Sequence, residues 1–237
     1  MKKKHNIFRH LIIFFLVTII SFSWNITNYS LVPAASKASY KIINYQKVKR
    51  YKKLSAKYLY QLPQLTGNNA TIQKINKSLR SDYRQSLEAK KNLFEFFETY
   101  KSSGSFYLKQ GAQFLSTTKC TVAYNRNGYI SFKFANDWWA GGVHNGYEYG
   151  LTYRLRDGKK MGIQDVIYGR QRDAKKNIAT AYARQVSSAQ YNNVLNMKYS
   201  DFNFYLKPGK RLIVCFGPYP PGGGNGHLSI IMQSKLR

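Results

Sequence analysis

The chain has 237 residues, with 38 Lys or Arg side chains against 10 Asp or Glu, and a formal net charge of +28. Its 20 Tyr, 14 Phe and 3 Trp supply more apolar surface for burial than a disordered chain carries. Two cysteines exclude a disulfide-rich scaffold, and four histidines, two of them among the first ten residues, argue against a histidine metal centre. The composition therefore predicts a folded, strongly basic protein without a metal or other cofactor.

Residues 1–38 have the three parts of a secretory signal peptide. A cluster of Lys and Arg precedes an apolar run of 14 residues from Leu11 to Trp24, and small residues follow up to Ala38. The run is shorter than the roughly 18 to 20 residues that a membrane-spanning helix needs. We therefore expect export. Ala34, Ala35 and Ala38 are the candidate cleavage positions, and cleavage after Ala38 would leave 33 cations against 10 acids, a net charge of +23.

From Lys41 to Leu65, apolar and aromatic residues alternate with Lys and Arg, a period that is typical of strands. Asn68 or Asn69 then provides the cap of a helix in which apolar residues recur three and four positions apart. This pattern continues to near Gly104, so the sequence predicts one long amphipathic helix.

Strand patterns return after this helix. Thr118–Tyr124 and Tyr129–Asp137 flank a turn sequence that contains Asn127-Gly128, which indicates a hairpin. A second, shorter helix is predicted to begin at Asp173. Further strands are predicted over Tyr147–Leu155, Phe202–Leu206, Leu212–Phe216 and Leu228–Met232.

These elements predict an α+β fold in which antiparallel sheets pack against one long and one shorter amphipathic helix. No linker, low-complexity tract or repeat is evident, so residues 39–237 are expected to form a single domain. Within it we expect an N-terminal half of about residues 39–137 and a C-terminal half of about residues 138–237.

Several segments, taken in order, resemble a known bacterial domain. They are Tyr60–Gly67, the stretch Trp139–Gly146 (WAGGVHNG), Tyr153–Ile167 with its Asp157-Gly158 turn, and Phe204–Tyr219. This order is similar to that of an extracellular domain of unknown function, which is shared by RsiV-type anti-sigma factors and the non-catalytic region of PdaC-type peptidoglycan deacetylases. The resemblance extends over residues 57–237.

The resemblance implies helices packed on antiparallel sheets outside the membrane. In the anti-sigma factors the domain binds lysozyme, so the resemblance also implies a binding or sensing domain for lysozyme or another wall hydrolase. Common lysozymes are themselves strongly basic, and long-range repulsion between like charges disfavours that ligand here.

No catalytic constellation is recognisable in the sequence. His144 stands in a glycine-rich stretch with Asp137 and Glu148 nearby, and we interpret it as a hydrogen-bonding residue of a tight connection. The glycine run before His227 lacks the Lys-Ser/Thr pair and the following helix of a phosphate loop. We therefore expect a protein that is not an enzyme.

Two further sets of residues are candidates for structural or binding roles. Cys120 and Cys215 both lie in predicted strands, where they form either one disulfide or two buried thiols. Aromatic residues next to loops are candidates for contacts with a ligand. The candidate ligand-binding residues are Trp138, Trp139, His144 and Tyr219.

Basic residues cluster in the sequence with few acidic neighbours. The candidates for polyanion binding are Lys49, Arg50, Lys52, Lys53, Arg154, Arg156, Lys159 and Lys160. Outside a bacterial cell, the abundant polyanions are wall polymers, anionic lipid head groups and shed nucleic acid. No specific nucleic acid is expected as a partner. The sequence predicts a secreted, non-enzymatic module that associates with the cell envelope by binding an anionic wall polymer or the membrane surface. The alternative is a domain that binds a protein ligand such as lysozyme.

Overall fold

The computed structural model describes residues 37–103, 113–140, 143–217 and 228–236. Residues Ala35–Arg237 form one compact unit, which contains every described element. The predicted signal peptide lies almost wholly outside the described residues, and so does Tyr219. No helix within the described ranges combines the length and the apolar composition needed to cross a bilayer.

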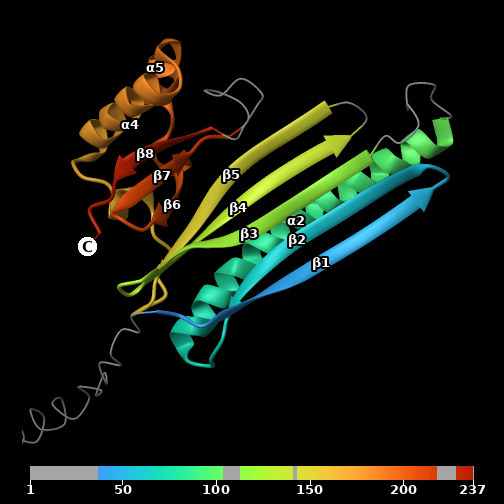
Figure 1. The fold of residues 1–237 in the computed structure, drawn as a ribbon, viewed down its shortest axis with the longest axis horizontal. Helices are drawn as coiled ribbons and strands as arrows, with labels where there is room; N and C mark the ends of the chain where they lie inside the picture. Colours follow the sequence, from blue (N-terminus) through green and yellow to red (C-terminus); the bar gives the residue numbers. More distant parts are fainter. Residues whose placement is uncertain (1–36, 104–112, 141–142, 218–227, 237) are drawn as a thin grey trace, which may run out of the picture. The chain divides into compact units, whose positions relative to one another are not determined.

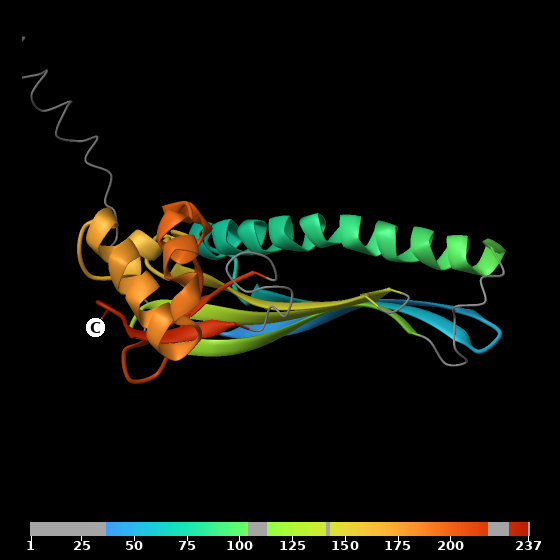
Figure 2. The same ribbon diagram turned by 90° about the horizontal axis from the view of Figure 1, so that it is seen from above.

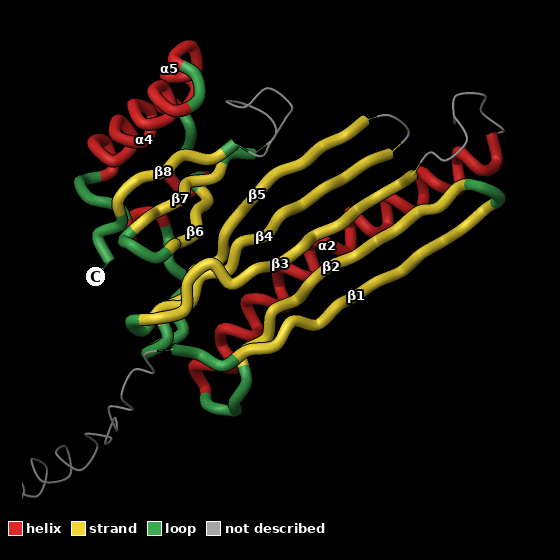
Figure 3. Tube along the Cα trace, in the orientation of Figure 1, coloured by secondary structure: helices red, strands yellow, loops and turns green. Residues whose placement is uncertain are grey.

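The first sheet has five strands in the order β1-β2-β3-β4-β5 (Figures 1 and 3). Their bounds are β1 Tyr40–Tyr51, β2 Leu54–Leu65, β3 Gln113–Arg126, β4 Tyr129–Ala140 and β5 Val143–Arg154. Three neighbouring pairs are antiparallel, as predicted, but β2 and β3 run parallel. A parallel pair needs a long crossover instead of a turn, and the helix between these two strands supplies it.

That helix is α2, Ala70–Ser103, which confirms the predicted long helix. The side chain of Asn69 caps it by accepting a hydrogen bond from the backbone N–H of Ile72 at 2.9 Å. Its apolar side, including Ile75, Leu79 and Phe97, is buried in the core that it shares with the sheet. α2 thus covers one face of the first sheet (Figure 2).

One of the polar contacts in this interface involves an acidic residue of α2. The Oδ2 atom of Asp82 on α2 accepts hydrogen bonds from the hydroxyls of Tyr60, at 2.5 Å, and Tyr149, at 2.7 Å. Burial, reinforced by the negative charge of Asp82, raises the pKa of both tyrosines far above the ordinary value. Both hydroxyls therefore stay protonated and tie α2 to strands β2 and β5.

The rest of the chain forms a second, three-stranded antiparallel sheet in the order β6-β7-β8, together with short helices. The bounds are α3 Ile163–Val166, α4 Gln171–Gln185, η1 Ser188–Gln190, α5 Tyr191–Asn196, η2 Tyr199–Asp201, β6 Asn203–Lys207, β7 Arg211–Cys215 and β8 Ser229–Gln233. The predicted second helix is α4, but it begins before Asp173. Val186 directly follows its last residue and is 37% exposed.

The two sheets meet where β6 crosses β4 and β5. The Ser131 hydroxyl on β4 accepts a hydrogen bond from the backbone N–H of Leu206 at 2.9 Å. On β5, a Cβ atom at Gly150 would lie 1.9 Å from the Phe204 carbonyl oxygen, so only glycine fits there. We expected the two halves of the domain to divide near residue 138, but Trp138 lies inside β4, and the first sheet continues to the end of β5.

Candidate functional site

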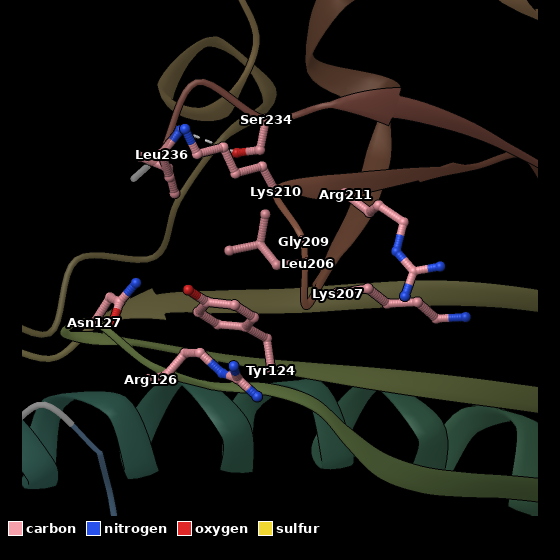
Figure 4. Close-up of a pocket in the computed structure, with 10 residues that line it drawn as sticks. All are labelled: Tyr124, Arg126, Asn127, Leu206, Lys207, Gly209, Lys210, Arg211, Ser234 and Leu236. Carbon is pink, nitrogen blue, oxygen red and sulfur yellow. Dashed lines mark hydrogen bonds between the residues drawn. The ribbon is translucent and has the colours of Figure 1, made fainter.

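A pocket of about 180 Å³ lies between the β3–β4 turn, the β6–β7 turn and the residues that follow β8 (Figure 4). We call it the junction pocket. It is lined by Tyr124, Arg126, Asn127, Leu206, Lys207, Gly209, Lys210, Arg211, Ser234 and Leu236. Four of these ten residues are cations and none is an acid.

Tight turns place the cations around this pocket. The predicted hairpin closes through a two-residue turn: Asn127 and Gly128 both have positive φ angles, 52° and 77°, as such a turn requires, and they leave Arg126 at the end of β3. In the β6–β7 turn Gly209 and Lys210 also have positive φ angles, 78° and 57°. The Lys210 carbonyl accepts a hydrogen bond from the Ser234 backbone N–H at 2.7 Å, which holds the C-terminal segment against the turn.

No Asp or Glu side chain neutralises the positive charge of the junction pocket. All ten of these side chains lie within the described residues, and none of them forms an ion pair with Arg126, Lys207, Lys210 or Arg211. The Arg211 Nε–H donates to the Pro208 carbonyl at 3.0 Å, an uncharged acceptor. Four like charges around one pocket create a field that attracts an anion.

The structure divides the predicted polyanion-binding residues between the two ends of the first sheet. Lys49, Arg50, Lys52 and Lys53 lie at or beside the β1–β2 turn. The other four begin with Arg154, the last residue of β5, and lie close to the β3–β4 turn. In the first group Lys49 is already paired with Glu98 of α2, at 2.6 Å between Nζ and Oε1. The eight residues therefore do not form one patch.

In the second group, Arg154 and Lys159 are also engaged by neighbouring acids. Arg154 pairs with Asp157, and this contact lowers the pKa of the Asp157 carboxyl to about 2. Lys159 pairs with Asp165 at 2.6 Å. Arg156 and Lys160 form no ion pair within the described part of the chain.

Sequence reasoning missed all four cations of the junction pocket. Arg126 lies about eighty positions before the other three, so no single run of charge marked the set. One signal was present, because Lys207, Lys210 and Arg211 surround the Pro208-Gly209 turn in the sequence KPGKR. Any hairpin there brings these three cations to its tip.

His144 does not lie in the tight connection that we predicted. It belongs to β5, where it is paired with Trp139 of β4. The two rings meet edge to face with centroids 6.2 Å apart, and His144 Nε2 lies 3.7 Å from Asp137 Oδ1. Trp139 is 43% exposed. Trp138 faces the other way, its ring 6.2 Å from that of Phe96 on α2, because successive residues of a strand point to opposite faces.

Cys120 and Cys215 are both free and buried, so the disulfide alternative is not formed. Burial raises the pKa of the Cys215 thiol to about 12, and it also raises that of Cys120. Both thiols are therefore neutral at physiological pH. Among the residues that the structure describes, no three His, Cys, Asp or Glu side chains gather into a group that could hold a metal ion.

Fold and pocket define an α+β domain in which a five-stranded sheet, covered on one face by a long helix, adjoins a three-stranded sheet. Two crystal structures of DUF3298 family members have this fold. One is from Bacteroides fragilis NCTC 9343, with a TM-score of 0.57 and 11% identity, and the other is from Pseudomonas aeruginosa PAO1, with 0.51 and 10%. Both alignments cover 84% of this chain and 91% of the other chain.

These neighbours belong to an uncharacterised domain family, in keeping with the predicted resemblance to a domain of unknown function. At this level of identity the likeness concerns the fold alone. The sequence matches no protein family model and no curated protein.

Proposed function

We propose that the protein is a secreted, non-enzymatic module of the bacterial cell envelope, which binds anionic wall polymers or the anionic membrane surface. The observation that carries the proposal is the junction pocket, which is lined by four cations that form no ion pair with an Asp or Glu side chain. The whole chain has 38 basic against 10 acidic residues, so the attraction for anions is not confined to the pocket. The signal-peptide pattern of residues 1–38 supports export.

Such binding is mainly electrostatic. A linear polyanion releases condensed counterions when Lys and Arg neutralise its charges, so the affinity falls steeply as the salt concentration rises. Charges on the rest of the surface act only within about 8 to 10 Å at physiological ionic strength, whereas groups in direct contact are screened less. The junction pocket is therefore the place where a phosphate or carboxylate group is held most firmly.

Binding of residues 39–237 to isolated cell walls at rising salt tests the proposal. The variant Lys207→Gln/Lys210→Asn removes two charges from the pocket, and asparagine tolerates the positive φ angle at position 210. The control Lys176→Gln/Lys198→Gln removes two exposed charges elsewhere. We expect the pocket variant to lose on the order of 10-fold in affinity and the control to lose far less.

Two results would contradict this reasoning. Retention on walls that does not change with salt would refute electrostatic binding altogether. Equal losses in the pocket variant and the control would show that the charge acts diffusely and that the junction pocket has no special part.

A second candidate function is the binding of a protein ligand such as lysozyme or another wall hydrolase. This candidate is favoured by the segments that resemble the RsiV-type domain in their order along the chain. The fold shared with DUF3298 proteins is compatible with it. Like charge opposes binding of a basic lysozyme. Titration calorimetry of the wild type and of the control Tyr219→Ala with lysozyme tests this candidate. If no heat of binding and no inhibition of lysozyme are found, the candidate is ruled out.

A further inference from the structure

The first sheet has a second face, opposite α2 (Figure 2), on which β6 packs at Ser131 and Gly150. On this face one side chain from each strand lies in a row across the sheet, as the pairing register shows. We call it the open row, and it consists of Val48, Lys57, Leu115, Trp139 and His144. None of the five is buried, so the row is accessible to a ligand.

The open row is far from the junction pocket. The turn residues of the pocket adjoin Tyr129, at the start of β4, whereas Trp139 lies ten residues further along the same strand. At about 3.3 Å per residue the two places are roughly 33 Å apart. A ligand at the open row therefore does not compete with one in the junction pocket.

Trp139 gives the open row the chemistry of a sugar-binding platform. An exposed indole ring offers a flat apolar surface, against which the C–H groups of a pyranose ring pack by dispersion. Beside it stand groups that exchange hydrogen bonds with sugar hydroxyls: the His144 imidazole, 52% exposed, and the Asp137 carboxylate, which lies 3.7 Å from it. An aromatic surface with a few polar groups around it fixes both the position and the orientation of a ring.

The charges on this face select an acidic polymer. Arg50, Lys57 and Lys119 point to the same side and form no ion pair within the described residues, whereas Lys133 is neutralised by Glu148 at 2.5 Å. Lys57 lies two strands from Trp139, about 10 Å at the usual strand spacing. That separation is comparable to one disaccharide repeat.

We infer that the open row binds a linear polysaccharide that carries carboxylate groups. One sugar ring packs on Trp139, its hydroxyls are hydrogen-bonded by Asp137 and His144, and a carboxylate of a neighbouring sugar meets Lys57. This goes beyond the proposed electrostatic association, because it requires a sugar ring at a defined place and involves none of the residues of the junction pocket.

The two tryptophans of residues 39–237 provide a matched pair of variants. Trp139→Ala removes the exposed ring, while Trp138→Phe changes the neighbouring ring on the α2 face and leaves Trp139 as the only indole. We would titrate hyaluronate oligosaccharides into each protein and follow the indole fluorescence and the heat of binding. Salt is kept high enough to suppress the long-range attraction.

We expect Trp139→Ala to bind hyaluronate at least about 10-fold more weakly than the wild type, and Trp138→Phe to bind it unchanged. Lys57→Gln is expected to weaken hyaluronate binding but to leave binding of neutral chitin oligosaccharides unaffected. Polyglutamate, which has carboxylates but no sugar rings, is expected to bind Trp139→Ala and Trp138→Phe as it binds the wild type.

Wild-type affinity in Trp139→Ala would overturn the inference, and so would polyglutamate binding that is as sensitive to Trp139 as hyaluronate binding. The junction-pocket variant Lys207→Gln/Lys210→Asn separates the two proposals. Its affinity for hyaluronate stays at the wild-type value if the open row is the site, and it falls if hyaluronate is held by the pocket instead.

Discussion

Replacing Asp82 by alanine should detach α2 from the sheet more effectively than any other single change to a charged residue of that helix. The change removes the acceptor of two hydrogen bonds, from the hydroxyls of Tyr60 and Tyr149. Each buried hydroxyl left without a partner costs about 1–3 kcal/mol. Tyr60 is fully buried, so it bears the whole penalty.

The penalty at Tyr149 is smaller. A cavity of about 160 Å³, lined by polar residues that include Ser116 and Asn136, adjoins this hydroxyl and Asp82. It gives room for water to replace the lost carboxylate in the variant. We therefore expect Asp82→Ala to lower the free energy of unfolding by about 2–4 kcal/mol, and Asp82→Asn, which keeps an acceptor oxygen, by about 1 kcal/mol.

Urea unfolding of residues 39–237 measures these differences. Glu88→Ala is the matched control, because it removes the same charge from the same helix. Glu88 is exposed and has no ion pair within the described residues. It should cost less than about 0.5 kcal/mol. A loss in Asp82→Ala no larger than in Glu88→Ala would refute the account, and equal losses in Asp82→Asn and Asp82→Ala would assign the effect to charge alone.

Three further outcomes are expected. Gly150→Ala should severely destabilise the contact between the sheets, because the added Cβ atom would meet the Phe204 carbonyl. Limited proteolysis measures this loss. The control Gly217→Ala should be neutral, since no described atom lies within 4 Å of the added Cβ atom. The depressed pKa of Asp157 means that its pairing with Arg154 stabilises the fold above the ordinary pKa of an aspartate and that this contribution is lost as the pH falls towards 2. Because the Asp157 side chain is 41% exposed, this contribution to stability should stay below about 1 kcal/mol. Titration of the Asp157 carboxyl by NMR measures the pKa shift, and the shift should be absent in Arg154→Gln. Both cysteine thiols should react with a thiol reagent only after unfolding, and reaction in the native state would contradict their burial.

Local patterns predicted the elements of this fold well. The Asn127-Gly128 turn and the cap at Asn69 both appear where the sequence placed them, because turn and cap chemistry depends on a few neighbouring residues. The parallel pairing of β2 with β3 was missed, since the strand pattern of each is the same in either orientation.

The candidate site was less predictable than the fold. Trp139 and His144 were recognised individually, yet their pairing depends on the β4–β5 register, which extends to Ala140 and Val143 and replaces the loop that the glycines indicated. The junction pocket requires Arg126 to meet residues that follow it by about eighty positions. Sequence periodicity cannot predict this contact, because the contact between these distant residues arises from the docking of the two sheets.

The parallel pairing of β2 and β3 also determines how the chain can reach its native state. The hairpin β1–β2 and the meander β3–β4–β5 close through short connections, so each is able to form early and independently. Joining them requires α2 to span the gap and dock first, and contacts of such long sequence separation slow folding. Until then the facing edges of β2 and β3 are unpaired templates for other chains, a hazard that the mutual repulsion of strongly basic molecules reduces.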